Sequence, residues 1–279
     1  MLVADAEGTR MCFLSGHRAL VGDTVTWEDA PGEGGKLISV DPRMTILRRI
    51  DPRGDEQLLA ANLRGLLVVA SVSDPSFHGP LIDRYIVAAE ADDLDVGIIL
   101  TKMDKGVSDT VEAEVAARKA LGIPVLRTST TNGDGLEDVR SFLNSHPGPW
   151  ALVGHSGVGK TSLIQALLPA NDVGPIGSIS EYWGAGKHTT TRTRLFPVEP
   201  HGEIVDSPGI RGFIPALLDP EVVRDHFPGV ESILCRYRDC LHRVGEDGCE
   251  AEGKVSPLLL ESYRSLIAET ASIRARARP

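Results

Sequence analysis

The chain has 279 residues, of which 42% are hydrophobic and 24% are charged, and its formal net charge is −10. This composition is ordinary for a globular protein, and the length allows one large domain or two to three small ones. The negative charge argues against a chain coated with nucleic-acid-binding surface, and the longest apolar run, residues 66–70, is far too short to span a bilayer. Because the acidic start lacks the layout of a signal peptide, we expect a cytoplasmic protein with no membrane association.

Residues 1–56 contain short β-like runs separated by turns. Strand-like patterns occupy residues 11–14, 21–27 and 36–40, and a glycine-rich turn precedes the last of them. Regular short strands with glycine turns predict a small β-barrel. An SH3-like barrel would give a similar pattern.

From about residue 62 predicted strands alternate with predicted helices. Apolar runs predict buried strands at 65–70, 96–100, 123–126 and 150–153, and helical spacing occurs at 81–91 and 111–121. Such alternation predicts a parallel α/β sheet covered on both faces. Near residue 220 the pattern changes to a Cys/His-rich segment, followed by a predicted helix at about 258–271.

A phosphate-binding loop is predicted directly after the strand at 150–153. The spacing Gly154-x4-Gly159-Lys160-Thr161 matches the pattern, and a helix follows it. Glycines let the backbone wrap an anion, so that amides and the helix N-terminus face the phosphates. Lys160 is expected to reach the β- and γ-phosphates in a catalytic role and Thr161 to bind Mg²⁺. A glycine-rich turn that merely opens a helix is the alternative. The predicted site comprises Gly154, His155, Ser156, Gly157, Val158, Gly159, Lys160, Thr161 and Ser162.

The tetrapeptide Thr101-Lys102-Met103-Asp104 predicts a guanine-recognition loop at the end of the strand at 96–100. The Asp104 carboxylate can accept hydrogen bonds from guanine N1–H and the 2-amino group, and the stem of Lys102 can lie along the base. Thr101 stands where asparagine is usual and cannot make the same amide contacts, so the anchoring of this loop to the phosphate loop stays open. Backbone amides near Ser129 and Thr130 are expected to meet guanine O6.

Two further segments have the character of nucleotide-sensing switches. Residues 203–209 read as a strand and a DxPG turn, in which Asp206 is expected to hold Mg²⁺ and the Gly209 amide to contact the γ-phosphate. Upstream, Thr190 is expected to reach Mg²⁺ and the γ-phosphate. Ile210 cannot orient water as a glutamine would, so intrinsic hydrolysis should be slow. His188 is the nearest substitute, although an exposed loop histidine would look the same.

A closed metal-ligand set is predicted near the C-terminus. Three thiols and one imidazole fall within fifteen residues, and four protein ligands suit structural zinc, because a catalytic site would leave one position open. Buried reduced cysteines without a metal are the alternative. The predicted ligands are Cys235, Cys240, His242 and Cys249.

The order of these motifs is unusual, because the base loop precedes the phosphate loop. The matching stretches are, in order, Ala61-Asn62, TKMD at 101–104, GHSGVGKTSL at 154–163, GKHTTT at 186–191, VDSPG at 205–209 and CRYRDCLH at 235–242. Over nearly its whole length the chain resembles the RsgA family, the circularly permuted GTPases that act on the small ribosomal subunit. The resemblance implies a multidomain protein with an OB-fold β-barrel at 1–56, a circularly permuted α/β P-loop GTPase domain at 57–220 and a zinc-binding helical domain at 221–279.

The resemblance also implies a function. We expect a GTP hydrolase that binds GTP, GDP, Mg²⁺ and one Zn²⁺, acts as a monomer on the small ribosomal subunit and its rRNA late in assembly, and leaves after hydrolysis. The alternative is a nucleotide-gated RNA-binding module in which hydrolysis is incidental.

Overall fold

The computed structural model describes residues 2–5, 8–30, 34–50, 56–168, 194–206 and 219–277. The chain divides into two compact units, Met1–Leu63 and Arg64–Pro279. The finer domain limits at residues 56/57 and 220/221 stay predictions. Within the described ranges, every helix is too short or too polar to cross a bilayer.

Unit 1 is built from two small sheets. The first has the strand order β1-β2-β4-β3, in which β2 and β4 are parallel and the other pairs are antiparallel, and β5 pairs with β6 in a separate hairpin. This is an OB-like half-barrel, in agreement with the predicted β-barrel. The strands are β1 Leu2–Asp5, β2 Gly8–Phe13, β3 Val25–Ala30, β4 Gly34–Val40, β5 Ile46–Ile50 and β6 Glu56–Ala61.

The core of unit 1 depends on a glycine at a crowded position. A Cβ on Gly35 would lie 2.7 Å from the sulfur of Cys12 and 2.9 Å from the Trp27 ring, so a side chain cannot be added there without a shift. Cys12 and Leu37 are both buried, in β2 and β4 of this sheet. Cys12 is therefore a core residue of this unit.

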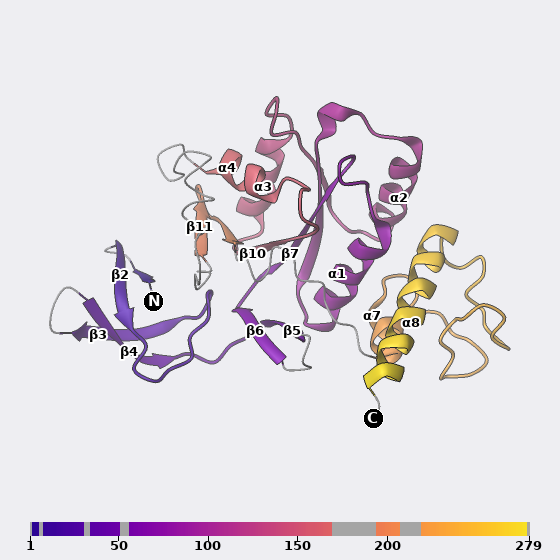
Figure 1. Ribbon diagram of the computed structural model, residues 1–279, viewed down its shortest axis with the longest axis horizontal. Coiled ribbons are helices and arrows are strands. Elements are labelled where there is room, and N and C mark those ends of the chain that lie inside the picture. Colours follow the sequence, from indigo (N-terminus) through magenta and orange to yellow (C-terminus); the bar gives the residue numbers. More distant parts are fainter. Residues whose placement is uncertain are drawn as a thin grey trace. The chain divides into compact units, whose positions relative to one another are not determined.

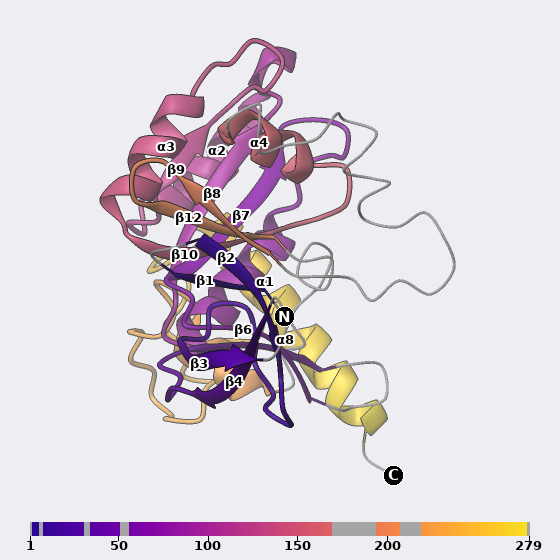
Figure 2. The same cartoon turned by 90° about the vertical axis from the view of Figure 1, so that its left-hand side faces the viewer.

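Unit 2 contains a six-stranded sheet with the order β11-β12-β10-β7-β8-β9, in which only β11 runs antiparallel to its neighbour. Figure 2 shows its labelled strands side by side. Every residue of β7 is buried, as expected for a parallel strand covered on both faces. The strands are β7 Gly65–Ser71, β8 Asp95–Thr101, β9 Val125–Arg127, β10 Gly148–Val153, β11 Arg194–Val198 and β12 Gly202–Asp206.

Helices cover both faces of this sheet. Figure 1 shows α3 and α4 on one side and α1 and α2 on the other. Buried side chains of α3 and α4 form one core with the sheet, which includes Trp150, Leu163 and Ile204. The helices, with the short 3-10 turn η1, are α1 Gly79–Ala91, η1 Met103–Lys105, α2 Asp109–Lys119, α3 Leu136–Ser145 and α4 Lys160–Leu167.

The C-terminal part of unit 2 packs on α1. Helices α7, Pro220–His226, and α8, Pro257–Ala277, form a second core with Val87 of α1, in which Phe227 meets Tyr263 edge-to-face. This is the predicted C-terminal helical part, and its connecting loop carries the Cys/His segment.

Parallel strands bring their carboxyl ends to the same edge of the sheet. Ser71 at the end of β7 pairs with Thr101 at the end of β8, and β10 pairs with both β7 and β12. The base loop, the phosphate loop and Asp206 therefore leave the same edge of one sheet, although the sequence places them far apart and in inverted order.

Candidate nucleotide site and metal centre

The phosphate loop connects β10 to α4 and depends on three glycines. Gly154, Gly157 and Gly159 have φ values of 135°, 83° and 99°, a region that residues with a side chain rarely adopt. A Cβ on Gly154 would also lie 2.2 Å from the carbonyl oxygen of Val69 in β7. The sequence thus folds here into a tight loop that presses against the sheet and opens a helix.

Lys160, the first residue of α4, reaches back over this loop. Its side chain is 6% exposed, and its Nζ donates to the carbonyl oxygens of Gly154 and His155, each at 2.7 Å. The ammonium is thus held inside the ring of the loop, where the β- and γ-phosphates of a nucleotide bind in such loops. Thr161 and Ser162 follow on the first turn of α4, where Thr161 can provide a hydroxyl to Mg²⁺.

Two side chains tie the base loop to the phosphate loop. Thr101 Oγ1 donates to the carbonyl oxygen of Val158 at 2.5 Å. Lys102, in the left-handed conformation with φ 61°, donates from Nζ to the carbonyl oxygen of Gly157 at 2.9 Å. The two loops are therefore joined directly by hydrogen bonds.

These contacts answer the question that the sequence left open at Thr101. Threonine lacks the carboxamide of asparagine, but its hydroxyl can donate one hydrogen bond, and that bond reaches the phosphate loop. The residue is 2% exposed, so the hydrogen bond is shielded from water and correspondingly strong. Thr101 anchors the base loop.

Asp104 is held by the second predicted base segment. Ser129 Oγ donates to Asp104 Oδ1 at 2.6 Å, while the Ser129 amide donates to the carbonyl oxygen of Asp134 at 2.9 Å. Ser129 thus acts through its hydroxyl, which orients the carboxylate, and its amide is occupied within the loop. The exposed Thr130 remains the candidate for guanine O6.

Asp206 ends β12 and is 2% exposed. Its neighbour Val205 pairs with Ala151, three residues before the phosphate loop begins. This places the carboxylate at the same sheet edge as Thr161. The remaining predicted switch residues, His188, Thr190 and Gly209, lie outside the described residues, as does Ile210.

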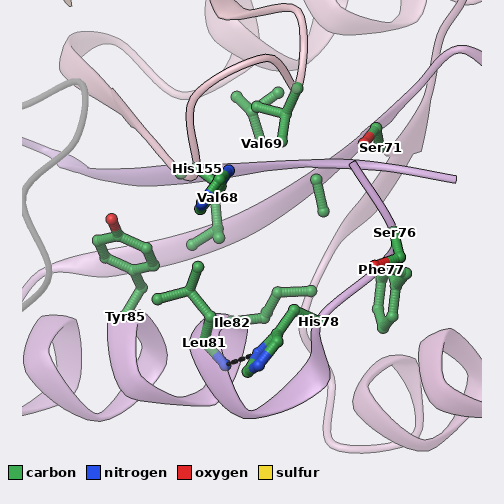
Figure 3. Close-up of a pocket in the computed structure, with 13 residues that line it drawn as sticks. Val68, Val69, Ser71, Ser76, Phe77, His78, Leu81, Ile82, Tyr85 and His155 are labelled. Atoms are coloured by element: carbon green, nitrogen blue, oxygen red, sulfur yellow. Dashed lines mark hydrogen bonds between the residues drawn. The ribbon is translucent and has the colours of Figure 1, made fainter. Parts of the chain in front are cut away.

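A small pocket adjoins the phosphate loop on the side of α1. Figure 3 shows His155 of the phosphate loop and Tyr85 of α1 lining it, together with Val68, Val69 and Ile82. Tyr85 is 1% exposed, and burial raises its pKa to about 12 despite a hydrogen bond from the Gly154 backbone. The phenol is therefore neutral at any physiological pH.

The four predicted zinc ligands come together in the loop between α7 and α8. Their donor atoms all lie within 4.8 Å of one another, and His242 Nδ1 is 3.4–3.6 Å from each of the three sulfurs. A tetrahedron with Zn–S of about 2.3 Å and Zn–N of about 2.0–2.1 Å has N···S edges of about 3.5 Å. The donor set and its spacing therefore fit a zinc ion.

The surroundings of the sulfurs also favour a bound cation. Burial raises the pKa of the Cys240 thiol to about 12, which disfavours the thiolate unless a positive ion compensates it. The amide of His242 donates to the Cys240 sulfur at 3.4 Å and that of Glu250 to the Cys235 sulfur at 3.2 Å, contacts that stabilise thiolate ligands.

Helix α8 holds this loop from behind. Tyr263 donates its hydroxyl proton to the carbonyl oxygen of Leu241 at 2.9 Å, and Arg264 Nε donates to that of His242 at 2.8 Å. One bond reaches the residue before His242 and the other reaches His242 itself, so helix α8 holds the backbone of the loop that carries the predicted ligands.

Comparison with known proteins decides the family. A profile of the RsgA GTPase family matches residues 40–214. The small ribosomal subunit biogenesis GTPase RsgA of Pseudomonas syringae pv. syringae is 38% identical over 259 residues, which cover 89% of this chain and 74% of that protein. The chain belongs to the RsgA GTPase family. The RsgA of Azotobacter vinelandii is 37% identical over 260 residues, with the same shares covered.

Solved structures agree with the RsgA architecture. The crystal structure of YjeQ from Thermotoga maritima matches with a TM-score of 0.76 at 26% identity and covers 97% of this chain and 94% of that one. The structure of YloQ, a circularly permuted GTPase, matches with a TM-score of 0.72 at 24% identity and covers 98% and 91%. The predicted fold class is thereby confirmed, with its OB-like half-barrel, permuted P-loop domain and C-terminal helical part.

The Thr101 anchor can be tested by a nearly isosteric change. Thr101→Val removes the hydroxyl and leaves the Val158 carbonyl oxygen without this donor, which costs about 1–3 kcal/mol for a buried acceptor. We expect the dissociation constant for GDP to rise about 10-fold, with the preference for GDP over ADP retained, in fluorescence competition. Thr101→Ser keeps the hydroxyl and should bind as the wild type does. Wild-type affinity in Thr101→Val would contradict the anchoring role.

Proposed function

We propose that this chain is a GTP hydrolase that acts on the small ribosomal subunit during the late steps of its assembly and leaves after hydrolysis. The observation that carries the proposal is the tether between the two loops, because Thr101 and Lys102 bind base-recognition and phosphate-binding elements into one site. The partner is inferred from the curated relatives, which are named small ribosomal subunit biogenesis GTPases.

The described residues support a mechanism of positioning and charge stabilisation. Asp104, oriented by Ser129, selects guanine by accepting from its N1–H and 2-amino groups. Lys160 moves from its loop carbonyls to the β- and γ-phosphates and, with the loop amides, stabilises the charge that develops on the transferring group. Thr161 and Asp206 are the residues that would hold Mg²⁺, whose charge neutralises the phosphate oxygens.

The water that attacks the γ-phosphate needs a polar group to orient it. Ile210 cannot do this, so we propose that the free protein hydrolyses GTP slowly and that contact with the small subunit activates it. His188 and Thr190 remain the proposed contributors from the chain itself. Because the partner would be an assembling ribosomal subunit, we place the activity in the cytoplasm.

GTP hydrolysis with and without purified small ribosomal subunits tests this function. We expect turnover to rise at least about 10-fold with saturating small subunits, because an activator that completes such a site adds several powers of ten in related enzymes. Large subunits are the matched control and should not stimulate.

The outcomes separate the two candidate functions. Turnover that stays slow with saturating small subunits, while the subunits still bind in a GTP-dependent way, would favour the nucleotide-gated RNA-binding module. Absence of both binding and stimulation would overturn the ribosomal assignment and leave the nucleotide site intact. For the monomer that we propose, light scattering should give the chain mass of 29.9 kDa, and twice that mass would contradict it.

We also propose that Cys235, Cys240, His242 and Cys249 hold one structural zinc ion, which makes residues 221–279 a zinc-binding domain. The proposal is supported by the closed Cys₃His set and by the N···S spacings near 3.5 Å. With all four positions taken by protein, the ion has no open site for substrate, so its role is to fold the loop between α7 and α8.

Metal analysis of two cysteine variants tests the zinc site. Wild-type protein should carry about one zinc per chain, and Cys240→Ala should lose it, because three ligands without the fourth no longer close the site. Cys12→Ala, which removes a buried thiol of unit 1, is the matched control and should keep one zinc. Undiminished zinc in Cys240→Ala, or a wild-type chain without zinc after expression in zinc-containing medium, would contradict the proposal.

A further inference from the structure

Three consecutive residues of α1 contact three different parts of unit 2. Successive residues on an α-helix point about 100° apart, so a tripeptide can face three ways. Tyr85 faces the phosphate loop, Asp83 faces α2 and α8, and Arg84 pairs with Glu269 of α8. Helix α1 therefore lies between the nucleotide site and the C-terminal helix that holds the metal centre.

Tyr85 contacts the phosphate loop at its first residue. Tyr85 and Gly154 line the same pocket beneath the loop, and the Gly154 backbone, acting on the phenol oxygen as a hydrogen-bond donor does, lowers the pKa of the phenol against the effect of burial. Gly154 is where β10 turns into the loop, with φ 135° and no space for a Cβ. A bond that holds this peptide in place also sets the orientation of the backbone amides that follow it in the loop.

The ring of Tyr85 is itself held in place. It is 1% exposed and lines the pocket beneath the loop with Val69 and Ile82, as Figure 3 shows. A buried ring in apolar surroundings loses little further freedom when it bonds the loop, so the contact adds to the pre-organisation of the site.

The opposite side of α1 is fixed by a buried charged network. Arg118 of α2 donates from Nε to Asp83 Oδ1 at 2.8 Å and from Nη2 to Asp83 Oδ2 at 2.6 Å, and its side chain is fully buried. Ser262 of α8 donates to the same Oδ2 at 2.5 Å. A Cβ on Gly79 would lie 2.6 Å from Arg118 Nη2, so a glycine at the start of α1 makes room for this guanidinium.

We propose that Tyr85 is a positioning residue for the phosphate loop, and that the contacts of Asp83 and Arg84 make α8 part of the support of the nucleotide site. The metal-bearing C-terminal part thereby influences nucleotide affinity without touching the nucleotide. The inference rests on the proposed function only in that the phosphate loop binds GDP and GTP.

A pair of matched tyrosine variants tests the first half of the proposal. Tyr85→Phe removes the bond to Gly154, and Tyr263→Phe removes an equally buried hydroxyl that bonds Leu241 instead. We expect Tyr85→Phe to raise the dissociation constant for GDP about 3–10-fold, the equivalent of one net hydrogen bond. Tyr263→Phe should lose comparable thermal stability and bind GDP within about twofold of the wild type.

The outcomes distinguish positioning from general destabilisation. Unchanged GDP affinity in Tyr85→Phe, or an equal loss of affinity in both variants, would overturn the role of Tyr85. A wild-type protein that binds no GDP would instead overturn the proposed function, and with it this inference.

The support from α8 is tested by Ser262→Ala, which removes the hydrogen bond to Asp83 far from the nucleotide. We expect the GDP dissociation constant to rise about 2–4-fold. In the Tyr85→Phe/Ser262→Ala double variant it should rise by less than the product of the two single-variant factors, because both changes act through α1. Wild-type GDP affinity in Ser262→Ala would show that α8 does not support the site, and fully multiplicative effects would overturn the shared route through α1 and Tyr85.

Discussion

The nucleotide site depends on one short hydrogen bond between two loops that the sequence places in an unusual order. Thr101 Oγ1 donates to the carbonyl oxygen of Val158 at 2.5 Å in a position almost closed to water. One loop carries the carboxylate that is predicted to select the base, and the other is the predicted phosphate-binding loop. The two loops leave β8 and β10, which are separated by β7, so this bond and the one from Lys102 join elements that the sheet does not pair directly. Without these bonds a nucleotide would have to order the two loops when it binds.

The inverted motif order is compatible with this site because the parallel sheet, rather than the order of the motifs along the chain, determines which loops lie next to one another. Strands β8, β7, β10 and β12 lie side by side and end at one edge, whichever of them the chain enters first. A circular permutation changes which ends are free and leaves the strand ends in place. The same reasoning explains how α1, which precedes the phosphate loop by more than sixty residues, supports that loop through Tyr85.

Motifs whose residue types and spacing are set by the group they bind could be predicted from the sequence. The glycines of the phosphate loop occupy positions with positive φ, and the four predicted metal ligands lie at the spacing that a tetrahedral site needs, because each motif is local and its geometry follows from residue type. The strands at 65–70 and 150–153 could also be predicted, since buried parallel strands are continuous apolar runs.

Contacts that depend on tertiary neighbours could not be predicted. No local pattern indicates that Thr101 replaces the missing asparagine, or that Ser129 uses its hydroxyl rather than its amide. Helix α1 begins at Gly79, earlier than its apolar spacing indicates, because the His78 side chain accepts from the Leu81 amide and caps it. The parallel pairing of β2 with β4 joins distant strands and has no local signal.

The most direct test of the account is the base preference of Asp104→Asn. An asparagine presents an amide N–H where the carboxylate accepted from the guanine 2-amino group, so it should reject guanine and accept the 2-oxo group of xanthine. Competition binding should show that the variant prefers xanthosine diphosphate to GDP, while the wild type prefers GDP to both xanthosine diphosphate and ADP. A variant that keeps the wild-type preference for GDP would show that residues 101–104 do not read the base, and the site described here would be wrong.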